Sequence, residues 1–325
     1  MKAYLGIDIG GTAVKLGIVR GPKLLLETSF PTSRIASGPK ALEEGLVASA
    51  RGLRDSFRGE VAAAGVGVPG LVLYPQGIVQ SCANVRAWKN LPLQARLRQR
   101  LGIPVRVDND VHAMALAEWK YGAGKGARNL VCVTLGTGVG GGFILDGRLY
   151  RSRRGPSAEI GHVAVGEEGP ACSCGGTACL ERYVGNRDVI RSLRHRLQRG
   201  AKSRIPQLVG HRLDRLTPEV IDRACALGDR VAIETWTEAG RKIGLVLANV
   251  ATLLSPDRIV IGGGLAGAGR WLFDPIRETL RARAMRPLGN VPVVPAKLGP
   301  TAGVVGAALL GQEAEDGGQR SDGRR

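Results

Sequence analysis

The stretch YLGIDIGGTAVKLGIV at residues 4–19 places strand-like apolar residues on both sides of a Gly-Gly-Thr turn, which is the pattern of a β-hairpin. A second stretch of the same shape, LVCVTLGTGVGGGFIL, occupies residues 130–145. This repetition predicts two halves of related design. A chain of 325 residues with 44% hydrophobic residues can bury two sizeable cores. We therefore predict a two-domain α/β protein.

The two glycine-rich turns differ from the Rossmann and Walker fingerprints, because each leads into an alternating strand pattern rather than a helix. Together, two such turns can offer backbone amides and threonine hydroxyls to one polyphosphate from opposite sides of a cleft. Glycine is required there because a Cβ would block close approach to phosphate oxygens. On this hypothesis Asp8 holds a metal through water and Lys15 adds a cation. For either turn taken singly, the alternative is a plain tight hairpin.

The stretch EIGHVAVGEEGPACSCGGTACLE at residues 159–181 is rich in glycine and poor in helical periodicity. Its possible metal ligands are His162, Cys172, Cys174 and Cys179. Three thiolates and one imidazole suit a closed tetrahedral zinc site, which shapes a loop and leaves no open position for water. Glu159 and Glu181 are then free for another partner. Carboxylates on a rigid polar loop suit a polyhydroxylated ligand.

The alternatives for these cysteines are a disulfide pair with a spare thiol, or simply buried thiols. No signal peptide is expected, because the apolar run after Lys2 is interrupted by Asp8. A reducing cytoplasm follows from this, and it disfavours disulfides. Cys82, Cys132 and Cys225 stand singly and are interpreted as small hydrophobic residues.

The segment PVRVDNDVHAMALAEWKYG at residues 104–122 predicts a short strand, an Asp-Asn-Asp connection and a helix that starts near Val111. Asp110 at the helix start can act as an N-cap, as a general base, or as both. Asn109 can donate to and accept from a sugar hydroxyl.

Later segments are less specific. A helix, a Ser-Pro-Asp turn, the strand RIVIGGG and a helix from Arg270 form an α/β unit, whose glycines either face a flat base or only make a helix-entry turn. The arginine-rich span 187–215 fits a solvated helix and loop, and residues 313–325 are predicted to be disordered.

Composition excludes other classes. No apolar run is long and unbroken enough for a membrane span. The formal net charge is +18, but arginine is spread along the chain and no basic stripe interleaved with aromatic residues is present. We therefore predict neither a membrane partner nor a nucleic-acid partner.

Five motifs together resemble the ROK sugar kinases and their repressor relatives. They are DIGGTAVK at 8–15, DND at 108–110, TLGTGVGGG at 134–142, EIGH at 159–162 and CSCGGTACLE at 172–181. The resemblance implies an actin and hexokinase-like ATPase fold, with ribonuclease H-like halves and a cleft between the domains. It implies a small domain at 1–112, joined by a helix at about 300–312, and a larger domain at 113–299 that carries the zinc loop.

The resemblance also implies residue roles, with Asp110 as the general base. The implied sugar contacts are Gly70, Asn84, Asn109, Asp110, Glu159, His162 and Glu181. The implied ATP contacts are Asp8, Gly10, Gly11, Thr12, Lys15, Thr134, Gly136, Thr137, Gly138, Gly140, Gly263 and Gly264. The implied zinc ligands are His162, Cys172, Cys174 and Cys179, and Asp8 is expected to hold magnesium through water. The sequence departs from the family at His112, where Asn is common, and at Ala158 and Ala178, where Gly is usual.

The activity implied is ATP-dependent phosphorylation of a hexose at its 6-hydroxyl, with glucose favoured because the segment CANVRAWKNLPL is most similar to glucokinase members. The alternatives are an N-acetylmannosamine kinase, and a fructose kinase or polyphosphate-dependent kinase. A sugar-sensing regulator is a further alternative, but we expect no room for a DNA-binding module before Tyr4. The expected setting is a cytoplasmic homodimer or homotetramer that uses ATP, Mg²⁺ and a structural Zn²⁺.

Overall fold

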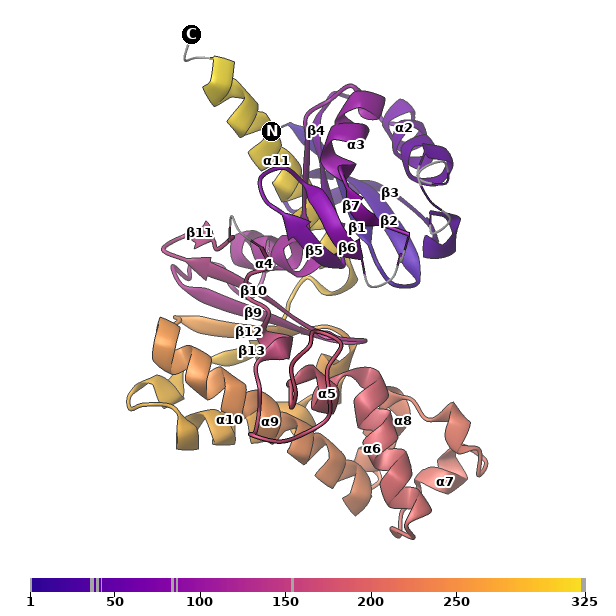
Figure 1. The fold of residues 1–325 in the computed structure, drawn as a ribbon, viewed down its shortest axis with the longest axis vertical. Helices are drawn as coiled ribbons and strands as arrows, with labels where there is room; N and C mark the ends of the chain where they lie inside the picture. Colours follow the sequence, from indigo (N-terminus) through magenta and orange to yellow (C-terminus); the bar gives the residue numbers. More distant parts are fainter. Residues whose placement is uncertain are drawn as a thin grey trace. The chain divides into compact units, whose positions relative to one another are not determined.

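The computed structural model describes residues 2–35, 38, 41, 43–82, 85, 87–152 and 155–322. Figure 1 shows the chain, which divides into two compact units. Unit 1 comprises Met1–Gly126, Gly142–Ala158 and Lys297–Arg325, and unit 2 comprises Ala127–Gly141 and Glu159–Ala296. The first boundary lies beyond the residue 112 expected from the sequence, because helix α4 (Asp110–Tyr121) packs against helix α11 (Ala302–Asp322) of unit 1.

Unit 1 is built on a five-stranded sheet with the strand order β3-β2-β1-β4-β8. Its strands are β1 (Ala3–Ile9), β2 (Ala13–Arg20), β3 (Lys23–Pro31), β4 (Val61–Val68) and β8 (Val105–Asn109). β1, β2 and β3 pair antiparallel, whereas β1, β4 and β8 pair parallel. The hairpin predicted at residues 4–19 is therefore confirmed. A smaller antiparallel sheet contains β5 (Gly70–Leu73), β6 (Ile78–Cys82) and β7 (Lys89–Leu91).

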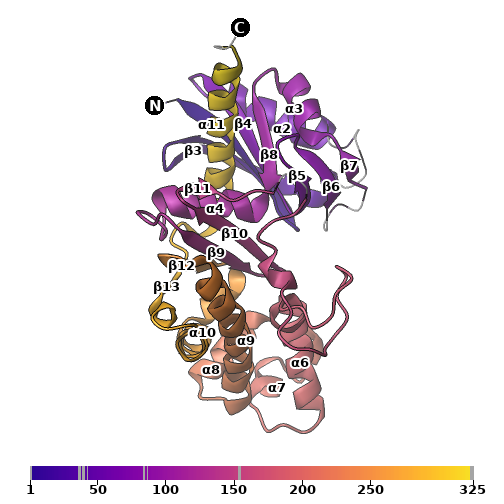
Figure 2. The ribbon, with the colours of Figure 1, turned by 60° about the vertical axis from the view of Figure 1, so that its left-hand side comes forward.

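Helices cover both faces of the five-stranded sheet. α11 lies along β1 and β4, as Figure 2 shows, whereas α2 (Ala48–Asp55) and α3 (Leu93–Leu101) pack with the apolar core that contains Leu5 and Ile7. The approach of α11 requires glycine in the strands. A Cβ on Gly6 would lie 2.0 Å from the carbonyl oxygen of Val304, and one on Gly65 would lie 1.8 Å from that of Ala307.

α11 continues to Asp322, so the tail predicted to be disordered from residue 313 begins within this helix. Tertiary contacts hold the start of this segment. Glu313 accepts a hydrogen bond of 2.7 Å from Arg151, and Glu315 accepts one of 2.9 Å from the Tyr4 hydroxyl. The polar composition of this segment does not reveal such contacts, because they join it to residues far away in the sequence.

The second five-stranded sheet has the order β11-β10-β9-β12-β13. Its strands are β9 (Leu130–Leu135), β10 (Val139–Leu145), β11 (Arg148–Leu149), β12 (Arg258–Gly262) and β13 (Val293–Pro295). β9, β12 and β13 pair parallel, and β11 pairs antiparallel with β10. The boundary between the two units falls within β10.

The helices of unit 2 follow the second glycine-rich hairpin. They are α5 (Glu181–Val184), α6 (Asn186–Gln198), α7 (Ile205–Leu208), α8 (Pro218–Ala226), α9 (Arg230–Leu254) and α10 (Arg270–Arg283). The predicted helix from Arg270 is confirmed. α9 packs closely on α10, because Gly240 and Gly244 present no side chain at the crossing. The arginine-rich span has a partly buried face, since Val189 and Leu193 of α6 are buried.

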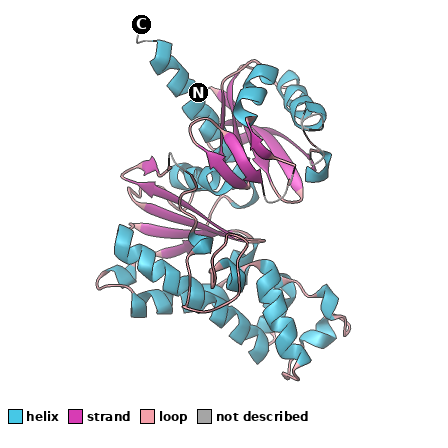
Figure 3. Cartoon of the chain, in the orientation of Figure 1, coloured by secondary structure: helices cyan, strands magenta, loops and turns pink. Residues whose placement is uncertain are grey.

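The stretch 159–181 is almost entirely loop, as Figure 3 shows, and its first regular element is the 3-10 helix η3 (Ile160–His162). Among the described residues, every helix is too short or too polar to span a bilayer.

Candidate active-site residues and metal centre

The first glycine-rich turn joins β1 to β2. Its closing hydrogen bond runs from Gly10 N to the Ala13 carbonyl at 3.0 Å, and the Thr32 hydroxyl donates to the Gly10 carbonyl at 2.7 Å. Gly11 and Thr12 are exposed at its tip. Their backbone and hydroxyl groups are thus presented to solvent, as a phosphate-binding turn requires.

Asp8 and Lys15 lie opposite each other on β1 and β2. Burial raises the pKa of the Asp8 carboxyl, and the charge of Lys15 opposes that rise. The first turn of α11 crowds this carboxylate, since a Cβ on Gly303 would lie 2.3 Å from Asp8 Oδ2. The need for glycine at position 303 was not predicted from the sequence.

The β8–α4 corner carries Asn109 and Asp110. Asn109 is the N-cap of α4, because its Oδ1 accepts hydrogen bonds from Val111 N at 2.8 Å and His112 N at 3.3 Å. Of the roles left open for Asp110, the N-cap therefore belongs to Asn109 instead, and Asp110 is the first helical residue. The Asn109 Nδ2 donates to the Gly70 carbonyl at 3.2 Å. This contact brings together two predicted sugar contacts.

The Asp110 carboxyl is in an environment that opposes its ionisation. Its burial, followed by the nearby negative charge of Asp8, raises the pKa of the Asp110 carboxyl to about 7. A carboxylate with a pKa near the working pH combines a large deprotonated fraction with useful proton affinity. Glycine at position 67 makes room for Asp110, whose Cα would lie 3.2 Å from a Cβ there.

A buried ionic network supports this corner. Asp108 Oδ1 accepts hydrogen bonds from Asn109 N at 2.7 Å and contacts His112 Nδ1 at 2.8 Å. Asp108 Oδ2 accepts from Arg151 Nε at 2.6 Å. Burial alone would raise the pKa of Asp108, but the contacts with His112 and Arg151 hold it at about 2. His112, noted in the sequence only as a departure from the family, thus has a structural partner.

The second glycine-rich turn joins β9 to β10 in unit 2. Gly136 N donates to the Gly138 carbonyl at 3.0 Å, and Asn186 N donates to the Gly136 carbonyl at 2.9 Å. The neighbouring predicted ATP contacts are Thr134 in β9, Thr137 in the turn and Gly140 in β10. Glu181 Oε2 accepts from Val139 N at 2.9 Å. The sequence predicts a free Glu181. In the structure, one of its carboxylate oxygens is instead bonded to the backbone of the turn.

The glycines after β12 have different environments. Gly263 has a φ of 87°, and a Cβ there would lie 2.2 Å from the Leu135 carbonyl oxygen, so close packing on β9 already requires glycine. Gly264 begins the 3-10 helix η5 (Gly264–Ala268), and nothing lies within 4 Å of its Cβ position. A binding role for Gly264 stays a prediction.

The predicted metal ligands converge within unit 2. One ligand atom from each of His162, Cys172, Cys174 and Cys179 lies within 4.8 Å of the others. The Cys172 Sγ to His162 Nδ1 distance and the Cys174 Sγ to Cys179 Sγ distance are both 3.6 Å. A disulfide needs about 2.05 Å between sulfurs, whereas zinc–sulfur bonds of about 2.3 Å place tetrahedral thiolates near this separation. The cysteines are free, so the disulfide alternative is wrong.

The backbone around the cluster has a conformation suited to glycine at the two positions where this chain carries alanine. Ala158 has a φ of 59° and Ala178 a φ of 53°, both in the left-handed region that favours glycine. Isolated bridges between Ala164 and Cys179, and between Ala171 and Thr177, fold the loop on itself. Asn84 lies outside the described residues, and Glu159 is half-buried immediately before η3.

The two β-hairpins with glycine-rich turns, each beside parallel strands of a five-stranded sheet, define a protein of the actin and hexokinase-like ATPase fold. The chain belongs to the ROK family, whose sequence pattern matches residues 4–314. The family resemblance predicted from the motifs is thereby confirmed.

Three relatives illustrate the similarity. The glucokinase of Streptomyces coelicolor is 35% identical over 323 residues, which cover 96% of this chain and 98% of that protein. The crystal structure of a ROK family glucokinase from Streptomyces griseus with glucose and AMPPNP has a TM-score of 0.83 at 33% identity, covering 96% of this chain and 99% of that one. The N-acetylglucosamine repressor of Escherichia coli O6:H1 is 30% identical over 292 residues, which cover 89% of this chain and 70% of the repressor.

Proposed function

We propose that this protein transfers the γ-phosphoryl group of ATP to the 6-hydroxyl of a hexose, with glucose as the preferred acceptor. The observation that carries this proposal is Asp110, a half-buried carboxyl at the start of α4 whose pKa is raised to about 7. Similarity to glucokinases over nearly the whole chain supports the choice of glucose.

Asp110 orients the hydroxyl of the sugar and accepts its proton as the phosphoryl group is transferred. Asn109 assists in a restricted way, because its Oδ1 already caps α4 and its Nδ2 already bonds to Gly70. The second hydrogen on Nδ2 is what Asn109 has left to offer the sugar. The rigid cap keeps both side chains in place before substrate binds.

We assign ATP binding to the two glycine-rich turns, which present backbone amides together with Thr12 and Thr137. Asp8 would hold Mg²⁺ through water, and that ion would neutralise negative charge on the phosphates. Lys15, exposed and opposite Asp8, adds a second positive charge at the first turn.

We assign Zn²⁺ to the Cys₃His cluster, whose donor set and spacing suit a closed tetrahedral site. Metal contact through His162 Nδ1 leaves its Nε2 for a sugar hydroxyl, and it fixes the ring in place. Glu159 stands three residues before this histidine, so both lie on the segment that the metal anchors. Glu181 supports the second turn and has the remaining carboxylate oxygen for the sugar. Assembly as a homodimer or homotetramer stays a prediction.

The test is an ADP-release assay with magnesium and ATP against glucose, N-acetylmannosamine, fructose and mannose, with Asp110→Asn as the blank. Turnover led by glucose supports the proposal in full. A preference for N-acetylmannosamine keeps the residue roles and changes the acceptor. A parallel assay of sugar phosphorylation with polyphosphate in place of ATP tests which phosphoryl donor the protein uses. Sugar binding without turnover for any donor would refute the kinase proposal. It would favour a sugar sensor, in line with the similarity to a repressor.

A further inference from the structure

A hollow of about 700 Å³ lies within unit 1, between β8, α4, the β10–β11 turn and α11. Its charged lining residues are Arg106, Lys120, Arg148, Arg151, Glu313 and Asp316. Four cations thus face two carboxylates, which leaves a positive excess. None of these residues belongs to the proposed catalytic or ATP-binding set.

The cations of the hollow are not equally available. Arg151 is already bound to Asp108 at 2.6 Å and to Glu313 at 2.7 Å. Within the described part of the chain, no ion pair is formed by Arg106, Lys120 or Arg148. These three side chains therefore carry the uncompensated charge of the hollow.

Aromatic rings lie against three of the four cations. The Arg106 guanidinium lies 5.4 Å from the centre of the Tyr74 ring, and that of Arg151 lies 4.5 Å from the same ring. Lys120 Nζ lies 4.2 Å from the Trp119 ring. Two guanidinium groups against one ring repel each other, and a bound anion would relieve that repulsion.

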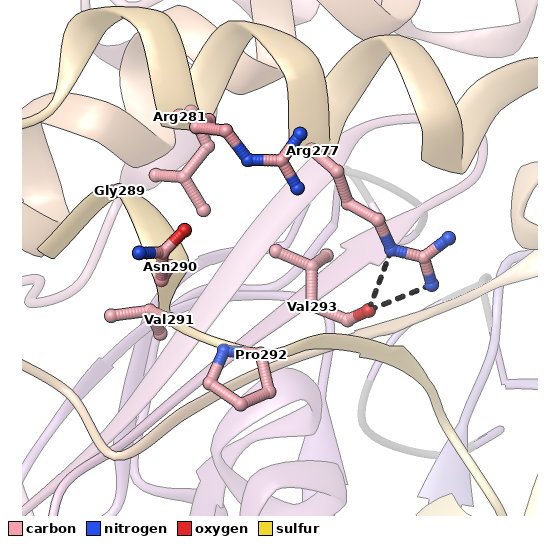
Figure 4. A pocket seen from close by; sticks show the side chains of 8 residues that line it. Arg277, Arg281, Gly289, Asn290, Val291, Pro292 and Val293 are labelled. Carbon is pink, nitrogen blue, oxygen red and sulfur yellow. Dashed lines mark hydrogen bonds between the residues drawn. The ribbon is translucent and has the colours of Figure 1, made fainter.

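A second basic hollow provides a contrast. Figure 4 shows the cavity of about 290 Å³ in unit 2 that is lined by Arg277 and Arg281. Arg277 donates to the Val293 carbonyl at 2.9 and 3.2 Å, and it pairs with Asp274 at 3.1 Å. The donors of Arg277 are therefore committed to the protein. In the larger hollow the Arg106 guanidinium donates only to the Pro75 carbonyl, at 3.3 Å, and no hydrogen bond or ion pair is formed by the side chains of Lys120 and Arg148 with described residues.

We propose that the hollow lined by Arg106, Lys120 and Arg148 binds a phosphate dianion, carried either by inorganic phosphate or by a phosphate monoester of a small metabolite. Guanidinium and ammonium groups recognise phosphate oxygens through charge-assisted hydrogen bonds. The hollow is large enough for a monoester with a sugar-sized group.

The test is titration of the full chain with inorganic phosphate and, separately, with glucose 6-phosphate, by calorimetry and by the NMR signal of the Trp119 indole N–H. We compare the wild type with Lys120→Glu/Arg148→Glu, whose two positions are exposed. The matched control is Arg281→Glu/Arg283→Glu, which makes the same change in net charge at exposed positions of unit 2. Lys120→Ala/Arg148→Ala is a milder variant should charge reversal disturb folding.

We expect binding that is at least about tenfold weaker in the Lys120/Arg148 variants and unchanged in the control, as charge-assisted contacts predict. Equal affinity for both probes identifies free phosphate as the natural source, whereas tighter binding of glucose 6-phosphate identifies a monoester. Binding of wild-type strength in the Lys120/Arg148 variants, or equal loss in the control, would overturn the proposal. So would the absence of binding by either probe. Because neither substituted residue takes part in the proposed catalysis, failure here leaves the kinase proposal intact.

Discussion

The β8–α4 corner and the loop at 159–181 position functional side chains by opposite means. At the corner, a strand, a helix cap and the Asp108 network fix Asn109 and Asp110 through packing and buried hydrogen bonds. The loop has two isolated bridges, one 3-10 turn and a few backbone hydrogen bonds, and four potential metal ligands converge within it. The comparison teaches that the fold itself preorganises the first region, whereas the second carries the ligand set to which we assign a metal.

The strongest test of the corner is Asp110→Asn, which keeps the size of the side chain and removes the base. We expect turnover to fall by about 10²–10⁴-fold, the range for loss of general base catalysis. Sugar affinity should change little, because the cap at Asn109 remains. Steady-state rates and equilibrium sugar binding measure both effects, with Asp55→Asn as a surface control. Retention of a substantial fraction of the wild-type rate would exclude Asp110 as the base.

The corresponding test of the loop is Cys174→Ala, which removes one metal ligand. We expect loss of bound zinc and a fall in sugar affinity of about 10–100-fold, as for the loss of groups that orient a metal site. Zinc content by metal analysis and sugar affinity by calorimetry measure this. The control is Cys225→Ala, a buried cysteine of the same unit outside the cluster. Unchanged sugar affinity in a verified zinc-free protein would show that the metal does not shape the sugar site.

The pH dependence should separate the two regions. Because Asp110 must be deprotonated to act, and its pKa is raised to about 7, activity is present above that pH and lost as the pH falls through it. We expect kcat/KM to fall by about tenfold per pH unit below the midpoint. Zinc content measured in the same samples should stay constant down to about pH 6, since bound thiolates resist protonation. The same assay measures kcat/KM between pH 5 and 8. A constant value over this range would contradict the raised pKa of Asp110.

The smallest expected effect concerns the backbone of the loop. The left-handed backbone conformation of Ala178 costs about 1–2 kcal/mol, and Ala178→Gly removes this strain. The glycine also gives the unfolded chain more conformational entropy, which destabilises the folded state by about 0.4–1 kcal/mol. We expect the free energy of unfolding of the zinc-loaded protein to rise by about 0.5 kcal/mol, measured by urea denaturation. The matched change Ala171→Gly, at a position without a positive φ, should lower it by about 0.5–1 kcal/mol. Equal effects of the two changes would show that strain at position 178 is unimportant.

Local patterns predicted much of the fold and site. The hairpin at 4–19, the helix from Arg270 and the convergence of His162 with three cysteines follow from spacing along the chain. Contacts between distant segments could not be predicted in this way. The bond from Val139 to Glu181 joins residues 42 positions apart, and the bond from Arg151 to Asp108 joins residues 43 positions apart. Both depend on how strands and helices pack, which no short motif records.

The return of the chain to unit 1 has a consequence for biosynthesis. Residues 297–325 complete a unit that begins at Met1, and α11 covers the glycine-bearing face of β1 and β4. During translation, all of unit 2 emerges from the ribosome before α11 does. Domains commonly fold in order from the N-terminus. Here the later unit can finish first, because the sheet of unit 1 can acquire the helix that covers one of its faces only after unit 2 has been synthesised.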